Sequence, residues 1–399
     1  MKQIAAKGMI LITIIFMDLL VGMEFDLFVP SFPELQNHFS LSPFWVEALL
    51  SFNFAGYCLS LFFVGGLADR YGRKPIILLG LITFVIGSIL CLWASFSFLL
   101  VGRFLQGVGI AAPSILSFLI IADSYSIKKQ QFLMAMLNGS MNVSVAVAPV
   151  IGSYITLYFH WQGNFIALLI LGLITLVMSI LFIPSYKLPQ PKETLSPRGY
   201  ISIFQSKPLM LLIVTILLIF VPYWIFVGIS PLLYIKDLGV SLSHFGYYQG
   251  VLALVYAFGS IIYGLILRSY NYNQKKMLYA SIQIFIISLI TITYVTFLNN
   301  LNPLFITLAF LPFIIAEVIP SAILYPLCLN FMPQAKGRVS ALVQGGRLIF
   351  AALGLQVAGY FYEGSFRNVG IIIISFIVVA VITLFFVIKN RELMNTGVS

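Results

Sequence analysis

The feature that most constrains this chain is a succession of long apolar segments separated by short polar ones. About 20 consecutive apolar residues cross the hydrocarbon core of a bilayer as a helix. Twelve segments of that length can be marked, at about 9–30, 44–65, 76–93, 98–122, 132–159, 165–183, 209–235, 245–267, 277–298, 304–332, 339–361 and 369–388. Charged residues make up only 9% of the chain, whereas soluble domains carry about 25%. The sequence therefore predicts an all-α integral membrane protein with twelve transmembrane helices.

One polar stretch is longer than the other connections. Residues 184–208 contain five prolines, which favour an extended linker over a helix. We therefore expect an N-terminal six-helix half at 1–183, a cytoplasmic linker at 184–208 and a C-terminal six-helix half at 209–399.

The cations of the chain indicate its orientation. With the N-terminus inside, 18 of the 22 Lys and Arg residues fall in cytoplasmic segments, and the opposite orientation would invert this ratio. We expect a multi-pass protein of a bacterial-type inner membrane with both termini in the cytoplasm. The net charge of +10 follows from this topology, so no nucleic-acid partner is expected. The three cysteines are isolated within apolar runs, and neither they nor the histidines have the spacing of a metal site.

A short charged turn separates the second and third segments. The flanking apolar runs carry a single ionisable residue, Glu47, whereas the turn has three cations in five residues. Such a turn must lie at a membrane surface. Its candidate functional residues, which we expect to control a conformational change, are Gly65, Asp69, Arg70, Gly72, Arg73 and Lys74.

Ionisable residues inside the apolar segments are the main candidates for chemistry, because a charge in hydrocarbon is costly and is retained where it functions. They are Asp18, Glu24, Asp26, Arg103, Glu317 and Arg347. A carboxyl group in a low-dielectric site can bind and release a proton near neutral pH. We therefore expect Asp18, Glu24, Asp26 and Arg103 to form the site of proton coupling and substrate binding.

Helical geometry assigns different faces to the three acids. On a continuous helix, Asp18 and Asp26 lie about 80° apart, whereas Glu24 lies on the other side, about 200° from Asp26. Arg103 and Asp26 have matching depths, so we expect them to pair. The alternative is that the charges form buried ion pairs that only order the helix bundle.

Three stretches resemble sequence motifs of the major facilitator superfamily. Residues Gly65 to Lys74 resemble the loop between the second and third spans of that family. Arg103 to Ala112 resemble the fourth-span motif of its drug:proton antiporters. Ala148-Pro149-x-x-Gly152 resembles their fifth-span antiporter motif, with Ala148 as a departure from the usual glycine.

The end of the first span resembles the Bcr/CflA (bicyclomycin/chloramphenicol resistance) subfamily, in Asp26 to Pro30 followed by Phe32-Pro33. The resemblance implies two parallel halves that alternate in access, and a proton and substrate role for Asp18 and Asp26. Glu24 is not part of this pattern, so the identity of the coupling acid stays open.

Several further residues could line a central cavity. Glu317 and Arg347 both fall near the middle of the membrane, where they either pair with each other or leave Arg347 for an anionic substrate. The other cavity candidates are Tyr57, Asn138, Asn142 and Gln344.

We interpret the sequence as a proton-coupled secondary transporter, an efflux antiporter for small amphipathic drugs. The alternative is a proton-coupled transporter of one metabolite, such as an organic acid or a siderophore. Signatures of intramembrane enzymes and an ATP-binding loop are absent, so we expect no enzyme activity. We expect no cofactor other than the proton gradient, and a monomer whose partners are substrate, protons and the lipid bilayer.

Overall fold

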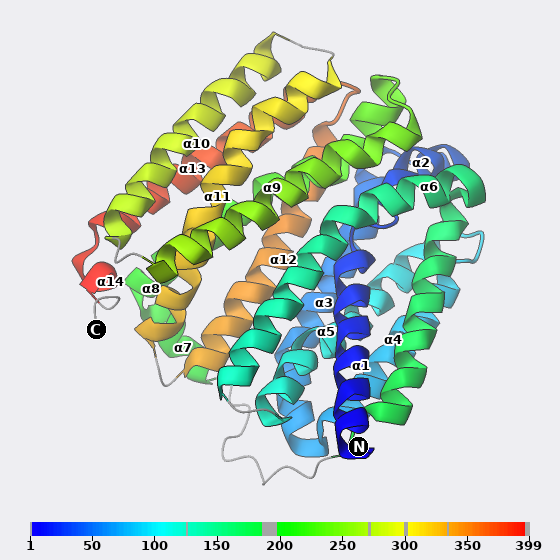
Figure 1. The fold of residues 1–399 in the computed structure, drawn as a ribbon. Coiled ribbons are helices and arrows are strands. Elements are labelled where there is room, and N and C mark those ends of the chain that lie inside the picture. Colours follow the sequence, from blue (N-terminus) through cyan, green and yellow to red (C-terminus); the bar gives the residue numbers. More distant parts are fainter. Residues whose placement is uncertain are drawn as a thin grey trace. The chain divides into compact units, whose positions relative to one another are not determined.

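A computed structural model of the chain describes residues 2–124, 127–185, 198–269, 273–298, 302–332 and 335–395. The secondary structure within these ranges is helical (Figure 1). By internal contacts the chain divides into two compact units. Unit 1 comprises 1–195 and 241–250, and unit 2 comprises 196–240 and 251–399.

Unit 1 is built from five long helices and two short ones. They are α1 (Lys2–Glu24), η1 (Val29–Ser31), α2 (Phe32–Phe39), α3 (Pro43–Tyr71), α4 (Arg73–Leu90), α5 (Phe96–Ser124) and α6 (Ile127–Phe182). Helix α5 is central, because α1, α3, α4 and α6 all contact it.

Helix α6 is longer than any single span and contains one break. At His160 the backbone leaves the helical region, with φ 61° and ψ −175°. Eleven described helices are long and apolar enough to cross a membrane, and residues 143–182 count as one of them. Because the break at His160 divides this stretch in two, the described helices account for the twelve apolar segments that the sequence predicts.

Contacts between distant segments define two ends of unit 1. At one end, Glu34 accepts a hydrogen bond from His160 at 3.0 Å, and the Phe39 ring lies 5.8 Å from Trp161. At the other end, Lys74 donates to the carbonyl of Ile180 at 2.7 Å. The connections after the odd-numbered and the even-numbered spans thus gather at opposite ends, as expected for helices that cross a membrane in alternating directions.

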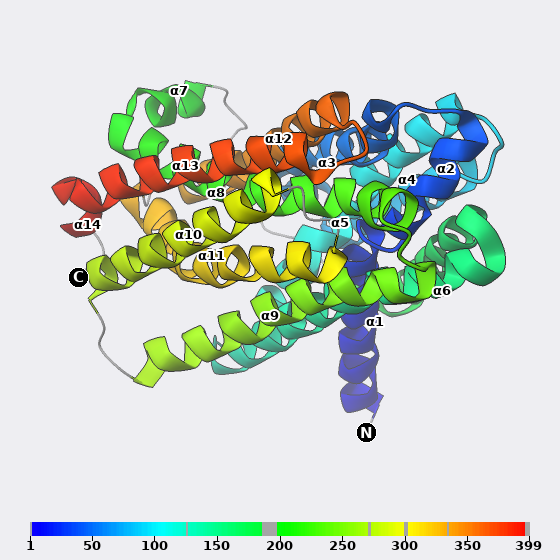
Figure 2. The same ribbon diagram turned by 90° about the horizontal axis from the view of Figure 1, so that it is seen from above.

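Unit 2 is also a bundle of long helices. Its elements are α7 (Arg198–Gln205), α8 (Lys207–Pro231), η2 (Leu232–Asp237), most of α9 (Leu242–Ser269), α10 (Gln274–Phe297), α11 (Pro303–Phe331), α12 (Lys336–Phe361), α13 (Phe366–Lys389) and α14 (Arg391–Asn395). Figure 2 shows α10, α11 and α13 as neighbouring rods. Helix α8 contacts α11, α12 and α13, and it is the most buried of the spans described in this unit.

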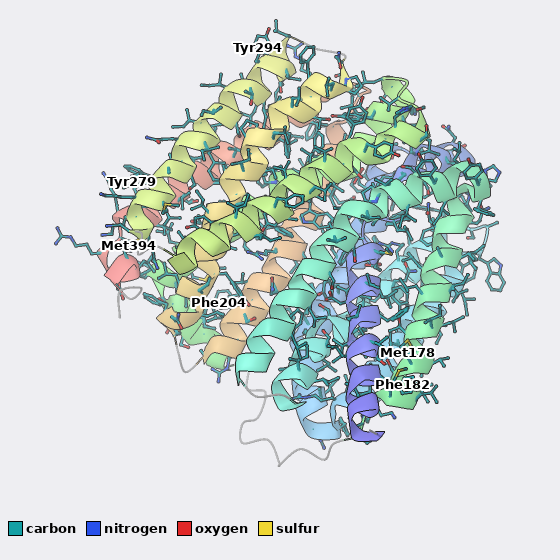
Figure 3. The ribbon with its side chains drawn as sticks, in the orientation of Figure 1. Met178, Phe182, Phe204, Tyr279, Tyr294 and Met394 are labelled. Carbon is teal, nitrogen blue, oxygen red and sulfur yellow. The ribbon has the colours of Figure 1, made fainter. Side chains whose placement is uncertain are left out.

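The outer surface of unit 2 carries aromatic residues at both ends of a span. Tyr279 and Tyr294 lie near opposite ends of α10 and point outward (Figure 3), with 41% and 63% of their surface exposed. Fifteen residues of helix separate them by about 22 Å. Tyrosines at this spacing suit the two interfaces of a bilayer, where amphipathic rings are enriched.

The first span ends earlier than the sequence suggested. We expected an apolar helix over 9–30, but α1 ends at Glu24 and residues 25–28 form a turn before η1. Pro30 lies inside η1 and Pro33 at the start of α2. Proline restricts the residue before it and lacks an N–H, so it favours the start of a new helix over the continuation of an old one.

Candidate functional site

A buried polar network lies at the centre of unit 1. Glu24, at the last position of α1, accepts hydrogen bonds at 2.6 Å from Arg103 of α5 and at 2.6 Å from Asn53 of α3. The Arg103 and Glu24 side chains are fully buried. The same Arg103 nitrogen, Nη1, donates to Gln106 at 2.6 Å, and Gln106 in turn donates to Ser88 of α4 at 2.8 Å. Side chains from four helices are thus joined around one ion pair.

The guanidinium of Arg103 is oriented by more than its acid partner. Its Nε donates to the carbonyl of Leu49 at 3.3 Å, and its Cζ lies 4.0 Å from the centre of the Phe28 ring. A cation over an aromatic face is stabilised by the ring quadrupole. Three polar atoms of the network could form further hydrogen bonds. Oε2 of Glu24, Oδ1 of Asn53 and Nη2 of Arg103 are buried without a partner among the described atoms.

Glycines bring the helices of this network together. A Cβ at Gly107 of α5 would overlap the carbonyl oxygen of Asn53, and a Cβ at Gly56 of α3 would overlap that of Phe104. The backbones of α3 and α5 can therefore approach closely only where both residues lack a side chain. This approach also allows Asn53 to donate to the carbonyl of Arg103 at 3.0 Å.

The expected pairing of Arg103 with Asp26 is wrong, because Arg103 pairs with Glu24. The reason is the early end of α1, since Asp26 lies in the turn and the helical angles between it and the other acids do not apply. Glu24 is fully buried among protein neighbours.

Asp18 and Asp26 take no part in the ion pair, although the charge of Glu24 acts on Asp26. Both are 3% exposed. Asp18 accepts a hydrogen bond from Ser140 of α6 at 2.7 Å. No hydrogen bond to the Asp26 carboxylate arises from the residues that the structure describes. One acid of the first span is therefore neutralised by a cation, one is hydrogen-bonded to a hydroxyl, and one has no described partner.

The motif at Ala148, Pro149 and Gly152 packs against the end of the first span. A Cβ at Gly152 would overlap the carbonyl oxygen of Leu27, the residue after Asp26. Pro149 lies within α6, and Ser153 donates to its carbonyl at 2.8 Å. Small residues at this point let the turn that holds Asp26 lie directly on α6.

The charged turn has the position that the sequence indicates. Helix α3 ends at Tyr71 and α4 begins at Arg73, so Gly72 alone connects them. Its φ of 95° lies in a region that favours glycine. Arg70 is exposed and Arg73 is buried, whereas nothing lies within 4 Å of a Cβ built on Gly65.

The remaining cavity candidates of unit 1 are described only in part. The hydroxyl of Tyr57 lies 2.6 Å from that of Ser114, and its ring lies 5.8 Å from Phe25. The side chains of Asp69, Asn138 and Asn142 lie outside the described residues.

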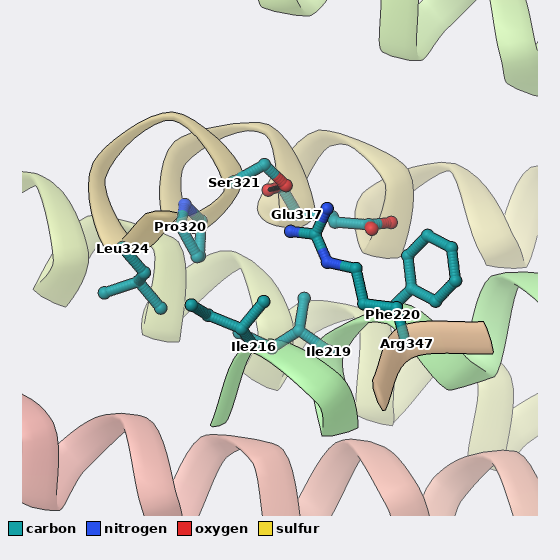
Figure 4. Close-up of a pocket in the computed structure, with 8 residues that line it drawn as sticks. All are labelled: Ile216, Ile219, Phe220, Glu317, Pro320, Ser321, Leu324 and Arg347. Atoms are coloured by element: carbon teal, nitrogen blue, oxygen red, sulfur yellow. Dashed lines mark hydrogen bonds between the residues drawn. The ribbon is translucent and has the colours of Figure 1, made fainter. Parts of the chain in front are cut away.

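A second group of candidates meets in unit 2. They belong to a pocket with about 220 Å³ of empty space, part of it open to solvent. Its lining residues come from three helices: Glu317, Pro320, Ser321 and Leu324 of α11, Arg347 of α12, and Ile216, Ile219 and Phe220 of α8. Figure 4 shows the guanidinium of Arg347 directed toward Ser321 and Glu317. Within the described chain these two charges lie farther apart than the 4.0 Å of an ion pair, so the first of the two alternatives, direct pairing, is absent. Gln344 instead accepts a hydrogen bond from Arg347 at 3.4 Å.

Sequence reasoning missed the amides and the hydroxyl of the network. Asn53, Gln106 and Ser88 are fully buried, but each stands alone in an apolar run. One signal was available, because Arg103 and Gln106 are three residues apart and therefore share a helix face.

Comparison with known proteins gives the class of the fold. The sequence pattern of the Major Facilitator Superfamily matches residues 14–344. The chain therefore belongs to this superfamily and is a multi-pass membrane protein.

Solved structures agree on the fold. A D-xylose-proton symporter superposes with a TM-score of 0.73 at 13% identity, covering 95% of this chain and 97% of that one. The peptide transporter POT in complex with sulfate has a TM-score of 0.76 at 13% identity, covering 95% and 94%.

Curated relatives are more similar in sequence but match over a shorter stretch. The multidrug resistance protein MdtL of Escherichia coli O9:H4 (strain HS) is 30% identical over 231 residues, 57% of this chain and 58% of that protein. MdtL of Klebsiella pneumoniae (strain 342) is 26% identical over 233 residues, 58% of this chain and 59% of that protein. The chain thus spans somewhat more than half the length of the curated relatives it matches.

Proposed function

We propose that this protein is a proton-coupled antiporter that exports small amphipathic drugs. Membership of the superfamily supports transport, and the names of the MdtL relatives support drugs as substrates. The sequence motifs further favour the Bcr/CflA subfamily. The observation that carries the coupling proposal is the contrast between Glu24, which Arg103 neutralises, and the two remaining buried acids of the first span.

The chemistry follows from this contrast. A buried carboxylate without a cation is costly, whereas its protonated form is not. Asp26, with no described hydrogen bond, and Asp18, with one from Ser140, would therefore exchange a proton when their surroundings change. Proton entry from outside would then compete with a cationic or polar substrate and drive its exit.

Purified protein in liposomes with an imposed pH gradient tests this proposal. We expect accumulation of drugs from a mixed panel, and at least a tenfold loss of proton-driven transport in Asp26→Asn and in Asp18→Asn. Glu34→Gln is the matched control, because Glu34 lies in α2 beside His160 and outside the network. Transport that is insensitive to the gradient, or unchanged in both Asp variants, would refute proton coupling through these acids.

Substrate-induced proton release measures the same step without a membrane. In detergent, wild-type protein should release protons when a transported drug binds, and at least one Asp variant should bind the drug without release. If both variants release protons normally, neither Asp18 nor Asp26 is the coupling acid.

A second function, the transport of a specific metabolite, is favoured by one observation. Arg347 faces a pocket in unit 2 and lacks a carboxylate partner within ion-pair distance among the described residues. Organic acids in the same liposome panel test this possibility, because a metabolite transporter would carry one of them in preference to all drugs.

A further inference from the structure

The pocket of unit 2 presents two opposite charges that share a space without pairing. Glu317 is 7% exposed, and the buried Nε of Arg347 has no hydrogen-bond partner among the described atoms. In the apolar part of a membrane protein, direct contact would be the least costly arrangement for two such charges. Their separation therefore requires an explanation.

The position of Arg347 is fixed by residues other than Glu317. Its guanidinium carbon lies 5.4 Å from the centre of the Phe220 ring and 5.8 Å from that of Tyr325. Gln344, one helical turn away, accepts from its Nη1. These contacts hold the cation at the pocket wall and leave its Nε edge free for an acceptor that the chain itself does not supply.

The opposite wall offers a negative charge on a locally modified helix. Pro320 lies inside α11, and it leaves the carbonyl of Ala316, four residues earlier, without its usual partner. Ser321 donates to the carbonyl of Glu317 at 2.7 Å and is also hydrogen-bonded to Tyr256, which leaves the Glu317 carboxylate as the acceptor of this wall. This wall can therefore accept hydrogen bonds from an ammonium group.

The rest of the lining limits the size and polarity of a ligand. Ile216, Ile219 and Leu324 make the pocket apolar apart from the two charges and Ser321. The empty space of about 220 Å³ includes open solvent at the mouth of the pocket, so the pocket can receive only one end of a small molecule and the rest of the ligand lies outside it.

We propose that this pocket binds the charged end of an amphoteric small molecule, with its carboxylate on Arg347 and its ammonium on Glu317. A planar guanidinium matches a carboxylate in a bidentate geometry, and a zwitterion compensates both charges of the pocket at once. A ligand with a single charge would leave one of them unpaired. This inference rests on the proposed function only in assuming that the protein binds small molecules.

Four probes that differ only in charge test the proposal. Phenylalanine is a zwitterion, phenylalanine amide is a cation, N-acetylphenylalanine is an anion, and N-acetylphenylalanine amide is neutral. Calorimetric binding to the purified full-length protein at pH 7, without a proton gradient, should give the tightest binding for phenylalanine. Each charge removed should weaken binding about tenfold or more, because hydrogen bonds to charged groups contribute at least that much.

Variants of the two charges should change the order of affinities in opposite directions. In Arg347→Gln the cation should bind at least as tightly as the zwitterion, and in Glu317→Gln the anion should do so. Arg347→Lys keeps the charge and should keep the zwitterion preference in a weaker form, which guards against a variant that fails to fold. The surface changes Arg367→Gln and Glu363→Gln are matched controls in the same unit and should leave the order unchanged.

The results separate this inference from the proposed function. Equal affinity for the four probes, binding of none of them, or an unchanged order in both charge variants would overturn the pocket proposal. If drug transport proves independent of protons while the probe order is as expected, proton coupling fails and the pocket assignment stands. If drug transport depends on protons while the four probes bind with equal affinity, the transporter proposal stands and the amphoteric site is refuted.

Discussion

Removal of either partner of the Arg103–Glu24 pair should destabilise unit 1 strongly, whereas removal of both should not. Each side chain is fully buried and the two meet at 2.6 Å. Arg103→Met leaves Glu24 as a buried carboxylate with only Asn53 as a donor. Glu24→Gln leaves an uncompensated guanidinium over Phe28.

The magnitude follows from two independent estimates. Opposite charges about 4 Å apart attract by about 4 kcal/mol at an effective dielectric constant near 20. Removal of one member of a buried pair typically costs about 3–5 kcal/mol, whereas replacement of both is close to neutral. Each single variant should therefore lose about 3–5 kcal/mol of unfolding free energy, and the double variant should lie within about 2 kcal/mol of the wild type.

Denaturant unfolding in detergent micelles measures these differences. Trp161 is buried in unit 1 and reports on its unfolding by fluorescence. Arg70→Met and Glu34→Gln are matched controls that remove an exposed and a half-exposed charge, and each should cost less than about 1 kcal/mol. Single variants that cost less than their controls, or costs that simply add in the double variant, would refute the argument that the pair is coupled.

Three further predictions concern other parts of the chain. Gly152→Val should abolish drug transport in liposomes, because its side chain would displace Leu27 and the turn beside it; normal transport would show that close approach is not needed. Glu47→Gln should keep or raise the unfolding temperature, because both Glu47 carboxylate oxygens are buried without a described partner and the amide removes a potential charge; a large drop would indicate a partner. Burial and a hydrogen bond to Asp237 raise the pKa of the Tyr362 phenol, so its stabilising contribution is complete below the unfolded pKa of about 10 and declines at higher pH. Wild type should therefore lose more stability than Tyr362→Phe between about pH 9 and 11, and parallel unfolding curves for the two proteins would contradict this.

The sequence predicts the fold well because bilayer thickness fixes the length of each apolar segment. The charged turn and the close approach at Gly152 could likewise be predicted from the sequence, since glycine and proline mark a sharp turn or a close contact. The pairing of Arg103 with Glu24 could not be predicted from the sequence, because residues 25–28 are mostly apolar and resemble a continuation of the helix. Only the end of α1 at Glu24 decides which acid reaches Arg103.

The pocket in unit 2 shows why the distance between two charged side chains is not predictable from one sequence. The positions of Glu317 and Arg347 in their spans indicate similar depths, which allow a pair but do not require one. The distance between them depends on how Phe220 of α8 and Tyr325 of α11 hold the guanidinium of Arg347. Such lateral contacts leave no periodic signal in a single sequence.

The single-residue corner at His160 has a practical consequence for studies of intact cells. A protease needs several residues of extended chain to bind its substrate, and exposed loop tips are its usual targets. Between the fifth and sixth spans, His160 alone departs from helical geometry. With both termini expected in the cytoplasm, this connection would face outside. Proteases added there should then leave it intact, and an epitope tag placed there would need its own flexible spacers to be recognised by an antibody.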